Sequence, residues 1–313
     1  MNMEAFVLGC GGVMPLPGRH LTSVLLRREG ELLLFDCGEG TQVSLRELNL
    51  RWKKISAIFI SHTHADHVTG LPGMLMLSAQ VDRSEPLYII GPPRIKEFVD
   101  WARDVLEMYI NYEIVVLEIE NPRAGGVVYR GDGFAVRSVP LNHTRTCVGY
   151  VLEEDDRPGV FHPERAIEAG VPRGPLWARL QQGEPVTLEN GAVVQPDTVV
   201  GPRRPGRKFS FITDSLHRKD LAAEVAGSDL LICEGMFHSE FRETAHEKKH
   251  MTAADAAELA AAAGGVRQMG LIHYSPRYAD WQLKLLLKDA KPIFPNTFLT
   301  RDRQAIELPY RDQ

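Results

Sequence analysis

Short runs of apolar residues recur along the chain and alternate with longer segments that mix apolar and polar positions. Runs of this kind that are rich in Leu, Ile, Val and Phe are typical of buried strands, and the segments between them favour helices and loops. This alternation predicts a layered α/β fold. The predicted strands are Glu4–Leu8, Ser23–Leu26, Leu32–Phe35, Ile58–Ile60, Leu87–Ile90, Phe134–Val139, Phe209–Ile212, Leu230–Cys233 and Met269–Ile272.

The best-capped predicted helix begins at Thr252. Asp255 stands three residues later, which is the spacing of a capping box, and an Ala-rich segment follows. Gly264-Gly265 then supplies the residues that most often end a helix. We therefore predict a helix between Thr252 and Gly264.

Residues 153–208 interrupt the alternation. This stretch is rich in Pro, Gly and Arg, and such composition is typical of loops and inserted segments. We predict a single domain over residues 1–313, with 153–208 inserted as a projecting arm.

Composition places the protein among globular chains. Its 313 residues allow one large or two modest domains, and no apolar run approaches the 18 residues of a membrane span. The first ten residues lack the basic start and apolar stretch of a signal peptide, so we expect a soluble, cytoplasmic protein. A net charge of −5 argues against general coating of nucleic acid. We expect reduced thiols at the four dispersed cysteines, Cys10, Cys37, Cys147 and Cys233.

The most informative segment follows the strand ending at Ile60 and reads His62-Thr63-His64-Ala65-Asp66-His67. It gathers three of the chain's 11 histidines and a carboxylate into six residues. Imidazole nitrogen and carboxylate oxygen are ligands that zinc accepts. Histidines two residues apart require an extended or turning backbone, so this is not the helical H-E-x-x-H arrangement. We predict a metal site in this loop.

Three further ligand-type residues, His143, Asp214 and His273, also follow predicted strands. Active-site groups in α/β sheets gather at the carboxyl ends of strands, so we expect these residues to meet the loop. The number of ligands suits two ions. A carboxylate can bridge two ions with its two oxygens. We assign His62, His64 and His143 to one ion, Asp66, His67 and His273 to the other, and Asp214 to both.

These residues also carry a family resemblance. The hexapeptide matches the H-x-H-x-D-H signature of the metallo-β-lactamase fold, and the chain resembles the ribonuclease Z family of tRNA 3′-processing endonucleases nearly from end to end. The resemblance implies an αββα sandwich, the seven ligands above, a homodimer, and precursor tRNA as substrate. The other motifs that carry it are Asp36–Gln42, Gly70–Gly73, Gly91-Pro92, His273–Tyr278 and a Gly-rich opening loop from Gly9 through Arg19 to Ser23.

The resemblance also assigns catalytic roles. It implies that Asp66 is the general base, and that two divalent cations, Zn²⁺ or alternatively Mn²⁺, assist phosphodiester hydrolysis. Glu234 and His250 match a carboxylate–histidine pair in which the imidazole serves as acid for the leaving 3′ oxygen. Their neighbours depart from the family pattern, since Gly235 and Met251 stand beside them. The expected products are a tRNA 3′-hydroxyl and a 5′-phosphorylated trailer.

Substrate recognition is expected from arginines. The segment Gly170–Leu180 resembles the family's tRNA-binding arm and contains Arg173 and Arg179. Arginines on a Gly/Pro framework suit recognition of tRNA by shape through its phosphates. Arg277, in the last family motif, is the third expected substrate contact. Thr213, where the family usually has glycine, departs from the pattern beside Asp214.

Three alternatives remain open. A phosphodiesterase for small or cyclic substrates would use the same metals but would not need the arm, so deleting Gly170–Leu180 would leave its turnover intact. A di-iron reductase of the same fold usually has Glu where His64 stands, which favours zinc. An inactive RNA-binding protein is disfavoured because every expected ligand and the base are present.

Overall fold

The computed structural model describes residues 3–81 and 83–312. The chain forms two compact units. The larger contains the described residues up to Gly131, then Ala135–Leu152, and everything from Arg207 onward. The smaller contains Asp132–Phe134 and Glu153–Gly206.

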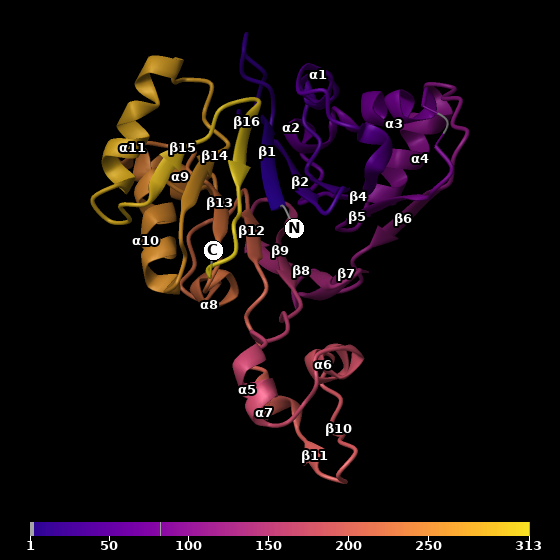
Figure 1. Ribbon diagram of the computed structural model, residues 1–313. Coiled ribbons are helices and arrows are strands. Elements are labelled where there is room, and N and C mark those ends of the chain that lie inside the picture. Colours follow the sequence, from indigo (N-terminus) through magenta and orange to yellow (C-terminus); the bar gives the residue numbers. More distant parts are fainter. Residues whose placement is uncertain (1–2, 82, 313) are drawn as a thin grey trace. The chain divides into compact units, whose positions relative to one another are not determined.

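The larger unit is built on two seven-stranded sheets (Figure 1). In each sheet one half consists of parallel strands: β3 to β6 in the first and β12 to β15 in the second. The first sheet has the order β16 (Gln304–Glu307), β1 (Met3–Gly9), β2 (Ser23–Arg28), β3 (Glu31–Phe35), β4 (Ile55–Phe59), β5 (Leu87–Gly91), β6 (Ile114–Glu118). The second has the order β15 (Thr297–Leu299), β14 (Met269–Ile272), β13 (Leu230–Glu234), β12 (Lys208–Ile212), β9 (Thr146–Glu154), β8 (Phe134–Asn142), β7 (Gly126–Gly131).

The sheets pack face to face through aromatic side chains. The Phe35 ring of β3 lies 5.1 Å from that of Phe209 and 5.9 Å from that of Phe211, both on β12. Helices cover the outer faces, because their apolar stripes join those of the strands in buried clusters. α1 (Thr41–Glu47), α3 (Leu71–Ala79) and α4 (Ile95–Val105) cover the first sheet, and α8 (Leu221–Val225), α10 (Ala253–Ala263) and α11 (Lys284–Ala290) cover the second (Figure 1).

Short elements complete the larger unit and bring loops to the strand ends. They are η1 (Trp52–Lys54), α2 (Ala65–Val68), η2 (Ser239–Phe241), α9 (Arg242–Glu247) and η3 (Asp280–Gln282). Within residues 3–81 and 83–312, no helix has the length and apolar character needed to cross a bilayer. The four cysteines are buried free thiols.

The smaller unit has a hydrophobic core of its own. Ala166, Val171, Leu180 and Val199 are buried there, and Trp177 packs against them. Its elements are α5 (Pro163–Glu168), α6 (Pro175–Gln181), β10 (Val186–Thr187), β11 (Val193–Val194) and α7 (Pro196–Val199).

All nine predicted strands are confirmed, with β4 ending one residue before Ile60. The helix predicted from Thr252 is also confirmed, and both bonds of its capping box are present. The αββα layering is the predicted fold class. The predicted strands did not include β6, β7, β9, β15 and β16 of the two large sheets, although β6 contains the apolar run Ile114–Leu117.

Candidate metal centre

The hexapeptide follows β4 as a loop that leads into α2. His64 is the extended residue that precedes the helix, with φ −69° and ψ 151°, so His62 and His64 can face the same point. β8, β12 and β14 end beside this loop and supply His143, Asp214 and His273. Four strand ends thus converge at one edge of the two sheets, as the sequence predicted.

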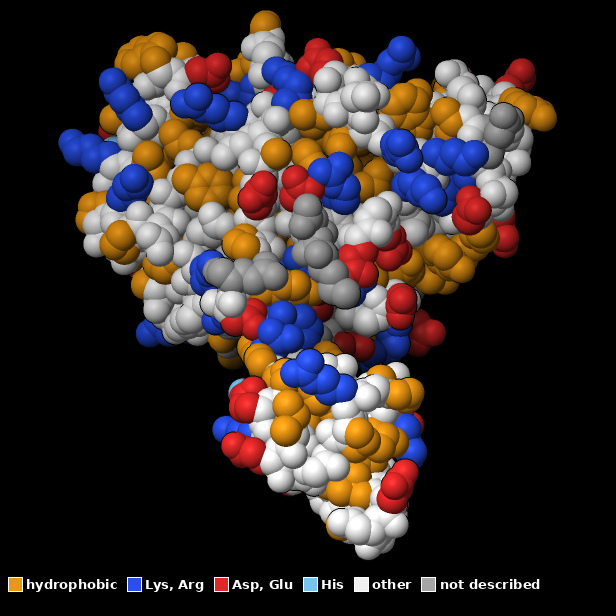
Figure 2. All heavy atoms as spheres, in the orientation of Figure 1, with side chains coloured by type: hydrophobic (Ala, Val, Ile, Leu, Met, Phe, Trp, Pro, Cys, Tyr) orange, Lys and Arg blue, Asp and Glu red, His pale blue; other side chains and the backbone are white. Residues whose placement is uncertain are grey.

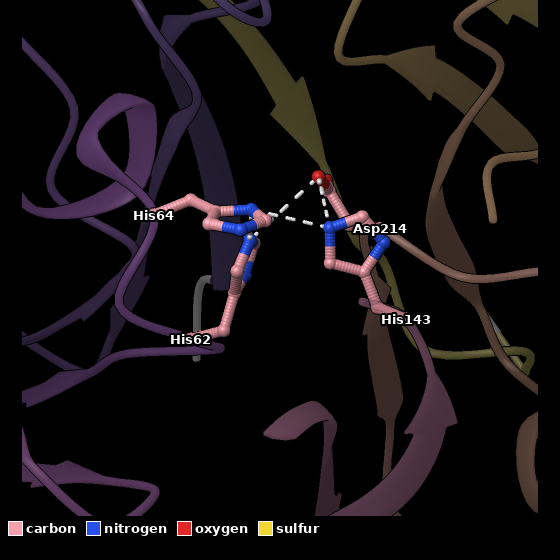
Figure 3. Close-up of side chains that lie close together, drawn as sticks. All are labelled: His62, His64, His143 and Asp214. Carbon is pink, nitrogen blue, oxygen red and sulfur yellow. Dashed lines mark hydrogen bonds and ion pairs between the residues drawn. The ribbon is translucent and has the colours of Figure 1, made fainter. Parts of the chain in front are cut away.

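The first group of side chains is drawn in Figure 3. His62 Nε2 lies 2.9 Å from His64 Nδ1, and His143 Nε2 lies 3.2 Å from that same atom. Asp214 Oδ2 lies 3.7 Å from His62 Nε2 and 3.6 Å from His143 Nε2. All four side chains therefore offer a ligand atom to one small volume.

The second group lies on the other side of Asp214. His273 Nε2 is 3.2 Å from Asp66 Oδ2 and 3.3 Å from His67 Nε2. Asp214 Oδ1 lies 3.4 Å from His67 Nε2 and 3.3 Å from His273 Nε2. Asp214 thus turns one carboxylate oxygen to each group, which is the arrangement expected of a bridging ligand.

These distances fit divalent cations. Ligand atoms placed tetrahedrally at about 2.0–2.1 Å from an ion are separated by about 3.3 Å, close to the spacings in both groups. The nitrogen and oxygen donors are those that zinc accepts. The structure therefore brings all seven predicted ligands together in a set that suits two ions.

The charges around these histidines also favour the binding of cations. Burial lowers the pKa of His62, and the neighbouring His67 lowers it further. Burial likewise lowers the pKa of His143 to about 4, so its ring nitrogens are free of charge at neutral pH. Burial opposes a charge on His67, but Asp214, Asp36 and Asp66 outweigh it and raise the pKa of this histidine. The negative field that attracts a proton to His67 also attracts a cation.

A second layer of polar groups holds the ligands. Asp36 Oδ2 lies 2.7 Å from His67 Nδ1, and Ser61 donates its main-chain N–H and its hydroxyl to the same carboxylate. The Lys249 carbonyl accepts from His143 Nδ1 at 3.0 Å. The hydroxyl of Thr213 donates to Asp214 Oδ1 at 2.9 Å. Such contacts fix which ring nitrogen faces the site.

The role of Asp36 escaped the sequence analysis, which treated it only as part of a motif. Its partners follow it by 25 and 31 residues. An available signal was the position of Asp36 directly after β3, the neighbour of β4 in the sheet.

Glu234 and His250 meet beside the seven ligands. Their Oε2 and Nδ1 atoms are 3.0 Å apart, and both residues are buried. His250 Nδ1 also lies 3.8 Å from Asp214 Oδ2. Burial disfavours the imidazolium, but the charges of Glu234 and Asp214 outweigh burial and raise the pKa of His250 to about 9. The imidazole is thus protonated at neutral pH in the metal-free protein.

The Gly-rich opening loop also reaches the site. A side chain at Gly12 would place its Cβ 2.6 Å from His273 Nε2, so only glycine fits there. Val13 has a φ of 70° and donates its main-chain N–H to Asp66 Oδ2 at 2.6 Å. A branched residue in this conformation is strained, and strain of this kind is common at functional sites.

The three predicted substrate arginines are differently placed. Arg277 lies over the rings of Phe241, at 4.3 Å, and Phe237, at 5.1 Å, and Phe237 packs against His250. Arg173 and Arg179 belong to the smaller unit, where they lie near Trp177 and Glu184. On the face of that unit drawn in Figure 2, hydrophobic side chains lie between scattered Lys, Arg, Asp and Glu.

Comparison with known proteins gives the same fold. The family model of the anti-Pycsar protein Apyc1 matches residues 3–104. The structure of human tRNase Z, short form, superimposes with a TM-score of 0.70 at 23% identity, covering 98% of this chain and 99% of the human one. This likeness confirms the metallo-β-lactamase fold predicted from the hexapeptide.

Several proteins have a higher sequence identity to this chain. Ribonuclease Z of Treponema denticola is 61% identical over 312 residues, which cover 100% of both chains. Ribonuclease Z of Borreliella burgdorferi is 40% identical and covers 98% of this chain and 97% of its own length. Identity at this level over the full length exceeds what a shared fold alone requires. The chain therefore belongs to the ribonuclease Z family.

Proposed function

We propose that the chain is a metal-dependent endoribonuclease that removes the 3′ trailer from precursor tRNA and leaves a tRNA 3′-hydroxyl. One observation carries this proposal: seven His and Asp side chains form two ligand groups that share Asp214, in a chain of the ribonuclease Z family. Two adjacent cations suit phosphodiester hydrolysis.

We propose two Zn²⁺ ions per subunit, with Mn²⁺ as the alternative ion. His62, His64 and His143 would hold one ion, Asp66, His67 and His273 the other, and Asp214 both. Bound there, the ions supply charge neutralisation at the phosphoryl oxygens and activation of water.

Proton transfer falls to the chain's own residues. Asp66 is the general base. Its pKa is held low by His67 and His273 against the opposing effect of burial, so it is ionised at neutral pH. His250 gives a proton to the leaving 3′ oxygen, and Glu234 orients its ring and keeps it protonated.

Substrate positioning falls to the arginines and to the arm. Arg277 binds a phosphate close to the site while Phe237 and Phe241 hold its guanidinium. Residues 153–208, with Arg173 and Arg179, form the tRNA-binding arm inserted in a single catalytic domain. Contacts of this kind position tRNA by its backbone and not by base sequence.

The decisive experiment incubates purified, zinc-loaded protein with precursor tRNA and with bis(p-nitrophenyl) phosphate. We expect one cut at the trailer junction, and a 3′-hydroxyl identified by its acceptance of ligated nucleotides. Turnover of the small ester alone would replace the tRNA assignment with that of a small-substrate phosphodiesterase. Elemental analysis identifies the metal and gives the number of ions per chain, for which we expect two.

The homodimer that the family resemblance implies and the cytoplasmic location expected from the sequence pattern complete the proposal. Sedimentation equilibrium at micromolar concentration is expected to give twice the chain mass. Cell fractionation is expected to recover the protein with cytoplasmic enzymes. A monomer that cleaves precursor tRNA at full rate would remove the dimer from the proposal without affecting the chemistry.

A further inference from the structure

Lys249 occupies a backbone conformation that normally favours glycine. It stands just past the end of α9, after the helical cap Lys248, and has a φ of 56°. Glycine is common at this position because a Cβ in the left-handed region costs about 1–2 kcal/mol. A lysine in this strained position, beside candidate catalytic residues, suggests that its side chain has a function.

The contacts of Lys249 place it on the wall of the metal centre. Its carbonyl accepts from His143 Nδ1 at 3.0 Å, and its ammonium donates to the His143 main-chain carbonyl at 3.3 Å. The next residue is His250. Among the described residues, no carboxylate forms an ion pair with the Lys249 ammonium, so its charge is not neutralised by the protein.

A second cation lies on the same side. Arg145 is exposed and stands two residues after His143, in the turn between β8 and β9. The Lys249 ammonium donates to the main-chain carbonyl of His143, the first residue of this turn, so the turn that carries Arg145 lies beside Lys249. Within residues 3–81 and 83–312, Arg145 also has no carboxylate partner.

We propose that Lys249 and Arg145 form a phosphate-binding rim that holds the RNA strand at a phosphate next to the scissile one. The inference rests on the proposed function, because a strand cleaved at this centre brings one phosphate per nucleotide past its edge. An ammonium and a guanidinium without carboxylate partners are suited to such oxygens. They would position the strand without reading its sequence.

The substitution Lys249→Gly tests the proposal sharply. Glycine adopts the left-handed backbone readily, so the carbonyl that holds His143 stays in place while the ammonium is lost. We expect KM for precursor tRNA to rise about tenfold, with a smaller change in kcat, since one charge-assisted hydrogen bond is removed. The slope of log KM against log salt should fall by about 0.7–0.9, the value for one phosphate contact.

Lys248→Ala is the matched control, because it removes the same charge from an exposed neighbour. It should change KM less than twofold. Arg145→Ala should raise KM by a factor similar to that of Lys249→Gly. Thermal unfolding of each variant shows whether it is folded.

Substrates with a methylphosphonate in place of one phosphate, on either side of the scissile bond, locate the contact. We expect the wild type to bind one of these substrates about tenfold more weakly than the unmodified substrate. Lys249→Gly should bind the modified and unmodified substrates almost equally well. Unchanged KM and salt slope in Lys249→Gly would overturn the rim. So would equal losses of kcat on precursor tRNA and on bis(p-nitrophenyl) phosphate, which would mean that Lys249 acts only through His143. Failure of the wild type to cleave precursor tRNA would instead refute the proposed function.

Discussion

The metal centre and the arginines of the smaller unit differ in what holds their polar groups. In the metal centre, Asp36 fixes the ring of His67, and the Lys249 carbonyl fixes the ring of His143. The side chains of Asp36, His67 and His143 are buried. In the smaller unit, Arg179 pairs with Glu184 while their side chains are 52% and 56% exposed. Exposed pairs of this kind contribute little free energy. The groups of the metal centre are thus fixed by buried contacts, whereas the exposed Arg179–Glu184 pair is held only weakly.

The largest expected effect comes from breaking the metal centre itself. Asp66→Ala removes a proposed ligand and the general base together. We expect kcat on precursor tRNA and on bis(p-nitrophenyl) phosphate to fall by about 10³-fold or more, because positioned bases alone contribute about 10²–10⁴-fold. Steady-state kinetics and elemental analysis of the same sample measure both losses.

Asp66→Asn is the matched control. It keeps the size of the side chain and one oxygen, so more metal should remain bound than in Asp66→Ala while the base is still lost. Hydrolysis at the wild-type rate by either variant would take Asp66 out of the mechanism.

The next effect concerns the buried pair behind the ligands. Glu234→Gln removes the charge that keeps His250 protonated, so we expect kcat to fall by about 10²-fold. The alkaline limb of its pH profile should also move to lower pH, because the pKa of His250 falls when the Glu234 charge is removed. A variant with the wild-type rate and profile would show that His250 is not the acid.

The same pair makes a prediction for the stability of the metal-free protein. Because the pKa of His250 is raised to about 9 in the folded state, its imidazolium stabilises the fold fully below the unfolded value of about 6.5. That stabilisation is lost as the pH rises through 9. Urea unfolding after chelation should show a loss on the order of 3 kcal/mol from this group between these pH values. The loss should be smaller in Glu234→Gln, where Asp214 remains but the Glu234 charge is gone. Parallel curves for the two proteins would contradict the assignment.

A smaller effect is expected in the smaller unit. Arg173→Ala and Arg179→Ala should each raise KM for precursor tRNA by about three- to tenfold and reduce its salt dependence, since each would lose a phosphate contact. Glu184→Ala is the informative partner, because it frees Arg179 from its ion pair and should lower KM slightly. If KM is unchanged in both arginine variants, residues other than Arg173 and Arg179 recognise the tRNA.

The ligands of the metal centre could be predicted from the sequence more fully than the groups that hold them. The ligands could be predicted because they cluster in the hexapeptide after β4 or follow other apolar runs, and active-site groups gather at the carboxyl ends of strands. The groups that hold the ligands could not be predicted. The Lys249 contact is made by a main-chain carbonyl, which any residue has. The Cys147 sulfur lies 3.6 Å from His62 Nδ1, but the two residues are 85 positions apart in the sequence.

In the fold, the same limit applies to weakly patterned elements. The fully buried strands and the capped α10 were predictable from apolar runs and from Thr252. The two-residue strands β10 and β11 were not, because a hairpin this short has no periodicity to detect. Likewise, Arg173 and Arg179 could be predicted as cations, but their contacts with Trp177 and Glu184 depend on how the smaller unit folds.

The smallest expected effect tests whether the opening loop belongs with the fixed groups or with the weakly held ones. Val13 is 57% exposed, yet its strained backbone donates to Asp66. Val13→Gly keeps that N–H and relieves about 1–2 kcal/mol of strain, of which about 0.4–1 kcal/mol is offset by the greater freedom of unfolded glycine. We expect a gain in unfolding free energy of about 0.5 kcal/mol in urea and a change in kcat below twofold. Val13→Ala, which retains most of the strain, is the control. If Val13→Gly instead loses activity while its stability rises, the strain at Val13 holds Asp66 in position, and the opening loop is part of the fixed metal centre.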